Sequence, residues 1–180
     1  MEIIRIYEPY IYSVQYDNMD ENEFDRLFNL WNDLAFVTSF LHSNAEYLQS
    51  DFWKGTHNVE SASDQVLNEA VALETLFDEL YQNSINGHKP DFDSHFKYLD
   101  GKYKYQMEWS PMKSYGTMRP SFLRIYAIRV ESNKYIITGG GIKLSDTIQN
   151  SPDLKDHVLQ NIDKVKEYIK AQGIVDGNDL

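Results

Sequence analysis

The chain has 180 residues, 28 of them acidic and 17 basic, for a formal net charge of −11, and it contains no cysteine. This length suits one domain with a core that needs no disulfides, and a hydrophobic content of 42% is too high for a disordered chain. The missing cysteine excludes thiol catalysis and cysteine-ligated zinc, and the acidic total argues against a general nucleic-acid or membrane binder. We expect a cytoplasmic protein, because the start MEIIRIYEPY lacks a signal-peptide pattern and no apolar run approaches the roughly 20 residues that span a bilayer.

The N-terminal part predicts a strand and then a helix. Residues 3–16 alternate and are rich in Ile, Tyr and Val, which favours a strand that Pro9 interrupts or places at a sheet edge. Apolar residues then recur every three or four positions from 24 to 41, which predicts a helix that ends near His42. Residues 45–53 fit a further short helix.

A second long helix is predicted over residues 61–85. Ser61 followed by Asp64 resembles a capping box with Asp in place of Glu. The apolar stripe repeats every three or four positions, and acidic residues occupy the remaining surface. Asn86-Gly87 ends this helix.

After residue 95 the pattern favours strands. Residues 96–99, Asp100-Gly101 and residues 102–106 predict a hairpin, because Asp-Gly supplies the positive φ angles of a two-residue type I′ turn. Residues 110–121 contain two Pro and one Gly and are predicted to be a loop. Two more strands are then predicted, over residues 122–130 and 134–144, with a turn at Ser132-Asn133.

A C-terminal helix completes the predicted order of elements. Ser151 is a good N-cap, Pro152 fits the first helical position, and Gly173 ends the helix. The order of strand, two long helices, three to four antiparallel strands and helix predicts an α+β domain. We expect one domain over residues 1–173, with an enlarged helical segment at 18–90 and a loose tail at 174–180.

The charge is unevenly distributed along the chain. Residues 1–100 hold 5 basic and 19 acidic residues, whereas residues 101–149 hold 8 basic and 3 acidic ones. The predicted sheet is therefore a basic module within an acidic protein, which is typical of segments that meet a polyanion. The alternative is that these Lys and Arg neutralise the acidic helices packed against them.

Two further features of the sequence bear on ligand binding. Residues 138–145 (TGGGIKLS) look phosphate-loop-like, but a P-loop needs G-x-x-x-x-G-K-[ST] and here Ile142 separates the last Gly from Lys143. The three Gly are better explained by a bulge in the strand or by close approach of another part of the chain. The five His are scattered, and without Cys they predict no metal centre.

Residues 96–170 resemble the sheet and C-terminal helix of the RelE/ParE/HigB-type toxins of bacterial toxin–antitoxin pairs. The resemblance is best at residues 123–126 (LRIY), which are similar to the family's yRi-Y strand, and Lys143 resembles the lysine at the end of the next strand. It departs from the family at residues 107–109 (MEW), where members commonly carry an Arg, and at Leu144 in place of a second lysine. The other matching positions are Leu99, Tyr105, the Ser132-Asn133 turn, residues 135–138 and the helix entry at 149–152.

The resemblance implies a toxin that acts as a metal-independent, ribosome-associated mRNA endonuclease and needs no cofactor. In such enzymes the 2′-hydroxyl attacks the adjacent phosphate, which requires a proton acceptor or orienting group and cations for the phosphorane charge. Arg124, Lys143 and Arg119 are the implied catalytic residues, and Tyr126, Lys102 and Lys104 the implied RNA-binding residues. The implied partners are a cognate antitoxin and mRNA on the ribosome.

Alternatives stay open for the individual residues and for the function. If the alternation holds, Arg124 and Tyr126 share one face of their strand. The alternative role for Arg124 is an ion pair with the acidic helices, and the alternative role for Tyr126 is packing in the core. A non-catalytic member of the same fold, ParE-like, would bind a protein partner instead, and its acidic helices would mimic nucleic acid or pair with a basic partner. An α+β domain unrelated to this family is the third reading.

Overall fold

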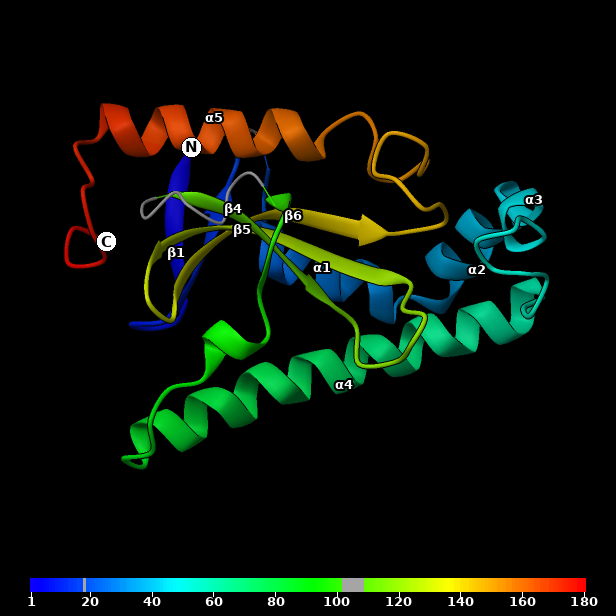
Figure 1. Ribbon diagram of the computed structural model, residues 1–180, viewed down its shortest axis with the longest axis horizontal. Helices are drawn as coiled ribbons and strands as arrows, with labels where there is room; N and C mark the ends of the chain where they lie inside the picture. Colours follow the sequence, from blue (N-terminus) through cyan, green and yellow to red (C-terminus); the bar gives the residue numbers. More distant parts are fainter. Residues whose placement is uncertain (18, 102–108) are drawn as a thin grey trace.

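The computed structural model describes residues 1–17, 19–101 and 109–180 (Figure 1). It confirms the α+β class, with an N-terminal hairpin, a group of helices, a six-stranded sheet and a C-terminal helix. None of the described helices has the length and apolarity that crossing a membrane requires. The elements in chain order are β1 (Glu2–Tyr7), β2 (Ile11–Gln15), α1 (Glu23–Asn32), α2 (Leu34–Ser43), α3 (Ala45–Leu48), α4 (Val59–Ile85), the short 3₁₀ helix η1 (Phe92–Ser94), β3 (Lys97–Tyr98), β4 (Ser110–Tyr115), β5 (Leu123–Glu131), β6 (Lys134–Ile142) and α5 (Val158–Ala171).

The sheet is larger and more mixed than the sequence pattern indicated. Its strand order is β1-β2-β6-β5-β4-β3, and the N-terminal segment supplies two antiparallel strands with Pro9 between them. β2 runs parallel to β6, with Ile11 beside Tyr135, whereas the other neighbouring strands are antiparallel. The predicted antiparallel sheet of three to four strands was therefore wrong in strand number and in one direction, because it left out the N-terminal strands.

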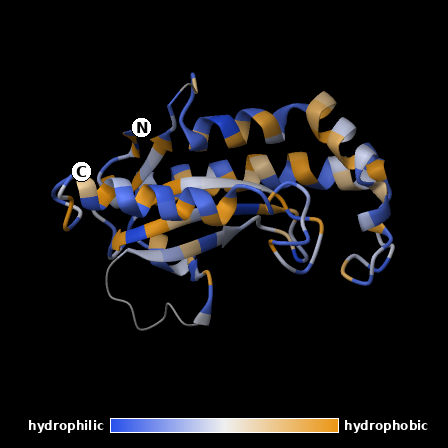
Figure 2. Cartoon of the chain, turned by 90° about the horizontal axis from the view of Figure 1, so that it is seen from above, coloured by the Kyte–Doolittle hydropathy of each residue, from blue (hydrophilic) through white to orange (hydrophobic). Residues whose placement is uncertain are grey.

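Helices cover both faces of this sheet (Figure 1). α5 packs on one face, while α1 and α4 pack on the other, so that each face has its own hydrophobic core. Residues of β5 alternate between the two cores, with Ile125 on the α1 and α4 side and Tyr126 and Ile128 on the α5 side. The helices carry apolar residues along one side and polar residues along the other, as expected for helices that pack on a sheet (Figure 2).

The first predicted helix is divided in two at Asp33. The Asp33 carboxylate accepts hydrogen bonds from the backbone N–H groups of Ala35 and Phe36 and so caps a new helix. The apolar period continues through the break, which is why the sequence predicted a single helix over 24–42. α4 begins two residues earlier than predicted, because Asn58 is its N-cap and Ser61 is the third residue of the capping box.

The largest correction concerns residues 110–121, which were predicted to be a loop. Residues 110–115 form strand β4, between β3 and β5 in the sheet. β3 pairs with this strand, with Lys97 opposite Lys113. The second half of the hairpin predicted across Asp100-Gly101 lies outside the described residues. Residues 102–108, which include Lys102 and Lys104, lie outside the described residues.

α5 begins at Val158 and not at the predicted start beside Ser151. The Ser151 hydroxyl instead accepts a hydrogen bond from the backbone N–H of Leu144, next to the end of β6, and residues 152–157 form turns. The helix ends before Gly173, as predicted. In the tail, the Asp179 carboxylate accepts hydrogen bonds from the N–H groups of Val175 and Asp176.

Two of the three glycines of β6, Gly140 and Gly141, fill places where no side chain fits. A Cβ on Gly140 would overlap the carbonyl oxygen of Arg124 on β5 and lie 2.8 Å from Leu27 of α1. A Cβ on Gly141 would lie 2.5 Å from the Asp153 carboxylate. β6 also carries one extra residue, because Tyr126 is opposite Gly139 and Ala127 is opposite Ile137. The bulge and the close approach of β5 and Asp153 confirm the structural explanation of the triple glycine. A P-loop would lead into a helix at this point, whereas here Ile142 continues the strand.

Gly140→Ala is expected to lower the free energy of unfolding by about 3 kcal/mol, because its new methyl group meets backbone that cannot rotate away. Urea denaturation checks this value. Gly101→Ala is the matched control, since no described residue has an atom within 4 Å of a Cβ at that position. The two variants should differ clearly, and equal stabilities would contradict the close packing of β5 on β6.

Candidate anion-binding site

The site is built from two pairs of side chains that face each other across β4 and β5. Tyr115 is opposite Arg124, and Lys113 is opposite Tyr126. Residues two apart on a strand share a face, so these four side chains all lie on the face that α5 covers. The predicted sharing of one face by Arg124 and Tyr126, with Ile125 on the other, is confirmed.

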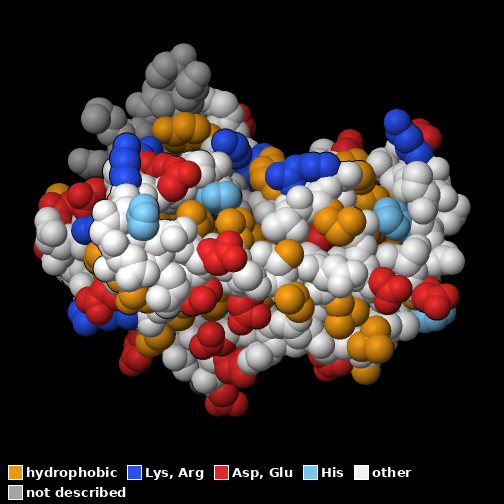
Figure 3. Space-filling model, turned by 90° about the horizontal axis from the view of Figure 1, so that it is seen from below, with side chains coloured by type: hydrophobic (Ala, Val, Ile, Leu, Met, Phe, Trp, Pro, Cys, Tyr) orange, Lys and Arg blue, Asp and Glu red, His pale blue; other side chains and the backbone are white. Residues whose placement is uncertain are grey.

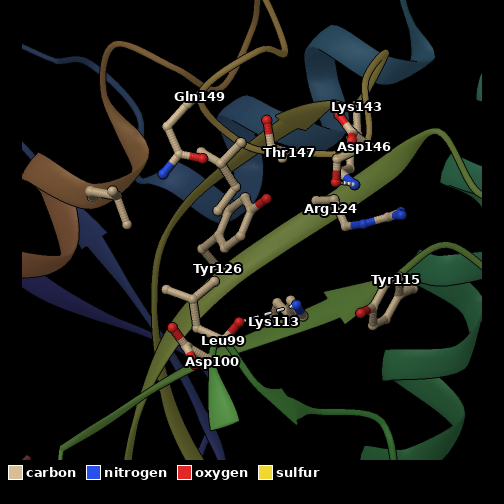
Figure 4. Close-up of a pocket in the computed structure, with 12 residues that line it drawn as sticks. Leu99, Asp100, Lys113, Tyr115, Arg124, Tyr126, Lys143, Asp146, Thr147 and Gln149 are labelled. Atoms are coloured by element: carbon tan, nitrogen blue, oxygen red, sulfur yellow. Dashed lines mark hydrogen bonds between the residues drawn. The ribbon is translucent and has the colours of Figure 1, made fainter. Parts of the chain in front are cut away.

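β6 and the loop after it close the other side of the site. Gly141 is opposite Arg124, and Lys143 follows two residues later on the same face. Together these strands and the 146–149 loop enclose a pocket of about 310 Å³ (Figure 4). We call it the basic pocket. Its lining residues are Leu99, Asp100, Lys113, Tyr115, Arg124, Tyr126, Lys143, Asp146, Thr147, Ile148, Gln149 and Leu159.

Arg124 is held rigidly at one end of the basic pocket. It is only 6% exposed, and one guanidinium nitrogen, Nη1, donates to the carbonyl oxygens of Ser121 at 3.0 Å and Leu123 at 2.7 Å. The guanidinium carbon lies 4.3 Å from the centre of the Tyr115 ring. Burial lowers the pKa of Arg124, against the opposing effect of Tyr126, Tyr115 and Glu69. Neutral partners therefore orient this cation, and no ion pair among the described residues includes it.

Lys143 lies beside Arg124 in the basic pocket (Figure 4). Its ammonium group donates to the backbone carbonyl of Asp146 at 2.7 Å and lies 4.9 Å from the centre of the Phe52 ring. Burial, with a smaller contribution from the charges of Arg124 and Lys113, lowers the pKa of Lys143 to about 8, against the opposing effect of Asp146. A lysine with this pKa exchanges protons near neutral pH.

Lys113 and Tyr115 belong to the site but were missed as candidates. The Lys113 ammonium group donates to the carbonyl of Leu99 at 3.1 Å, and Tyr115 stacks on Arg124. The alternation of Lys113 and Tyr115 in residues 112–115 (MKSY) was the available signal, but Pro111 and Gly116 on either side favoured a loop.

The remaining predicted residues are placed less centrally. The Arg119 guanidinium lies 5.4 Å from the Tyr115 ring centre and donates to carbonyls of its own loop, so it adjoins the basic pocket without lining it. Tyr126 is 1% exposed and packs in the core beneath α5, and it also lines the pocket (Figure 4). Core packing, the alternative reading for Tyr126, therefore describes it well, and burial raises its pKa.

The charges of the basic pocket favour an anion. Lys113, Arg124 and Lys143 face Asp100 and Asp146, and among the ion pairs of the described residues none includes any of the three cations. Arg124 thus does not pair with the acidic helices, which was its alternative role. Within residues 1–17, 19–101 and 109–180, no three His, Asp or Glu side chains gather as metal ligands.

A buried glutamate of α4 fixes the backbone that holds Arg124. Glu69 is fully buried, and its carboxylate accepts hydrogen bonds from the N–H groups of Phe122 and Leu123, each at 3.2 Å. It also accepts from the Ser121 hydroxyl and the Gln65 amide, each at 2.7 Å. These bonds position the segment whose carbonyls receive Arg124, so α4 supports the site from the opposite face of the sheet.

Comparison with models of known protein families, with curated proteins and with solved structures gives no match for this chain.

Proposed function

We propose that this chain is a RelE-like toxin that cleaves RNA at the basic pocket without a metal ion. The observation that carries the proposal is that Arg124 and Lys143, the two residues that best match the family pattern, line one pocket together with Lys113. Three cations that are not ion-paired with described carboxylates suit a phosphodiester, whose charge grows as the phosphorane forms. The cognate antitoxin and ribosome-bound mRNA are its proposed partners.

The chemistry divides between a fixed charge and a titrating group. Arg124 stays protonated and stabilises the oxygens of the phosphorane, since its guanidinium is already oriented by two carbonyls and the Tyr115 ring. Lys143, with its pKa near 8, accepts the proton of the attacking 2′-hydroxyl and returns it to the leaving 5′-oxygen. Lys113 adds a second positive charge for the scissile phosphate.

Induced expression with RNA analysis tests the proposed activity. The wild-type chain should arrest growth and cut mRNA, and the purified protein should cut single-stranded RNA in the presence of EDTA. Growth arrest with intact mRNA would instead indicate the protein-binding, ParE-like alternative. If neither growth nor RNA changes, the toxin proposal is wrong.

The cleavage rate is expected to rise with pH and to level off above about pH 8, because protonated Lys143 cannot accept a proton. The measurement is single-turnover cleavage with excess protein. Lys143→Met should reduce the rate about 100-fold. Lys143→Arg keeps the charge but does not titrate in this range, so it should abolish the step near pH 8, and a persistent step would assign the titration to another group.

A further inference from the structure

The acidic helices carry a hollow that shares no lining residue with the basic pocket. α2 and the first turn of α4 form a groove of about 600 Å³, which we call the α2–α4 groove. Six of its eight lining residues are polar or charged, but carbon atoms make up most of the lining surface, and Leu34 there is 56% exposed. The lining residues are Leu34, Thr38, His42, Asn58, Val59, Glu60, Ser63 and Asp64.

The acidic charge around this groove favours a basic partner. Residues 27–88 hold nine acidic residues and a single basic one, Lys54. Glu60 and Asp64 at the groove are exposed, and neither takes part in an ion pair among the described residues. Acidic side chains are spread among apolar ones over the face seen in Figure 3. Such a surface attracts a basic partner and repels nucleic acid and anionic lipid.

The shape of the groove favours a helix. Two packed helices present ridges and grooves that receive a third helix, with apolar side chains at three- and four-residue spacing entering between them. A symmetric contact with a second copy would oppose the same acidic surface on both sides, which is unfavourable. We propose that the α2–α4 groove binds a basic amphipathic helix of a partner protein. This surface is independent of the basic pocket and of its proposed activity.

A fluorescein-labelled peptide of about 18 residues, with Leu at helical spacing and Lys elsewhere, is the probe. Fluorescence anisotropy should show binding to the wild-type chain, and a peptide with Glu in place of Lys should not bind. Leu34→Ser should weaken binding about tenfold, because it removes the exposed apolar contact. Val71→Ser is the matched control, since Val71 is 57% exposed on α4 but does not line the groove, and it should change affinity less than twofold.

Two matched double variants test the contribution of the acidic side chains to binding. Glu60→Gln with Asp64→Asn should weaken binding several-fold, whereas Glu74→Gln with Asp78→Asn, an identical spacing farther along α4, should have little effect. Absence of binding to wild type, or equal losses in the groove and control variants, would overturn the proposal. So would a wild-type dimer in light scattering that Leu34→Ser abolishes, since the occupant would then be a second copy. RNA cleavage should be unchanged in all these variants.

Discussion

Glu69→Ala is expected to lower the free energy of unfolding by about 4 kcal/mol. The Glu69 carboxylate is fully buried and accepts four hydrogen bonds, three of them from residues 121–123. Without it, the backbone N–H groups of Phe122 and Leu123 lose their acceptor in a buried place, and the Ser121 hydroxyl keeps only the Leu123 carbonyl at 3.2 Å. Each such orphaned donor costs about 1–3 kcal/mol.

Urea denaturation of Glu69→Ala, Glu69→Gln and Glu74→Ala measures this effect. Glu69→Gln keeps one acceptor oxygen of the same shape and should lose about 2 kcal/mol, roughly half as much as alanine. Glu74 is exposed on the same helix, so Glu74→Ala should stay within about 0.5 kcal/mol of wild type. A Glu69→Ala protein as stable as Glu74→Ala would mean that α4 does not anchor the start of β5.

The sequence pattern predicted β5, β6, the turn between them and the body of α4, because each depends on local alternation or helical spacing. It missed β4 because Pro111 and Gly116 are loop signals. Pro111 has no N–H to donate, but its carbonyl accepts a hydrogen bond from the Leu99 N–H, and this lets it lie within the strand. The parallel pairing of β2 with β6 joins residues more than 100 positions apart, and no local pattern reports such a contact.

The candidate site was predicted in part for the same reason. Arg124 and Lys143 stood out by their resemblance to a family strand, but Lys113 and Tyr115 join them only through the register of β4 against β5. Glu69 was indistinguishable from the other acidic residues of its helix, since a buried carboxylate and a solvated one look alike in a sequence. What a residue does here depends on which backbone groups the fold brings to it.

Arg124→Gln is expected to reduce RNA cleavage by about 100- to 1,000-fold, the range seen when one preorganised donor to a developing oxyanion is removed. The neutral amide keeps a donor but loses the charge and the planar stack on Tyr115. Arg124→Lys restores the charge alone, so a loss of about tenfold is expected, because an ammonium group does not reproduce the geometry of the guanidinium. The readout is the single-turnover rate at saturating protein.

Arg129→Gln is the control that separates chemistry from folding, since Arg129 lies on the same strand but donates to Asp93 at 2.9 Å. Burial would raise the pKa of Asp93, yet hydrogen bonds from Tyr135, Asn133 and Ser132 and the charge of Arg129 hold it below its usual value. Arg129→Gln should therefore reduce stability, most clearly above the pKa of Asp93, and leave the cleavage rate of the folded protein unchanged. If Arg129→Gln and Arg124→Gln slow cleavage equally, Arg124 acts through the fold of β5 and not on the phosphate.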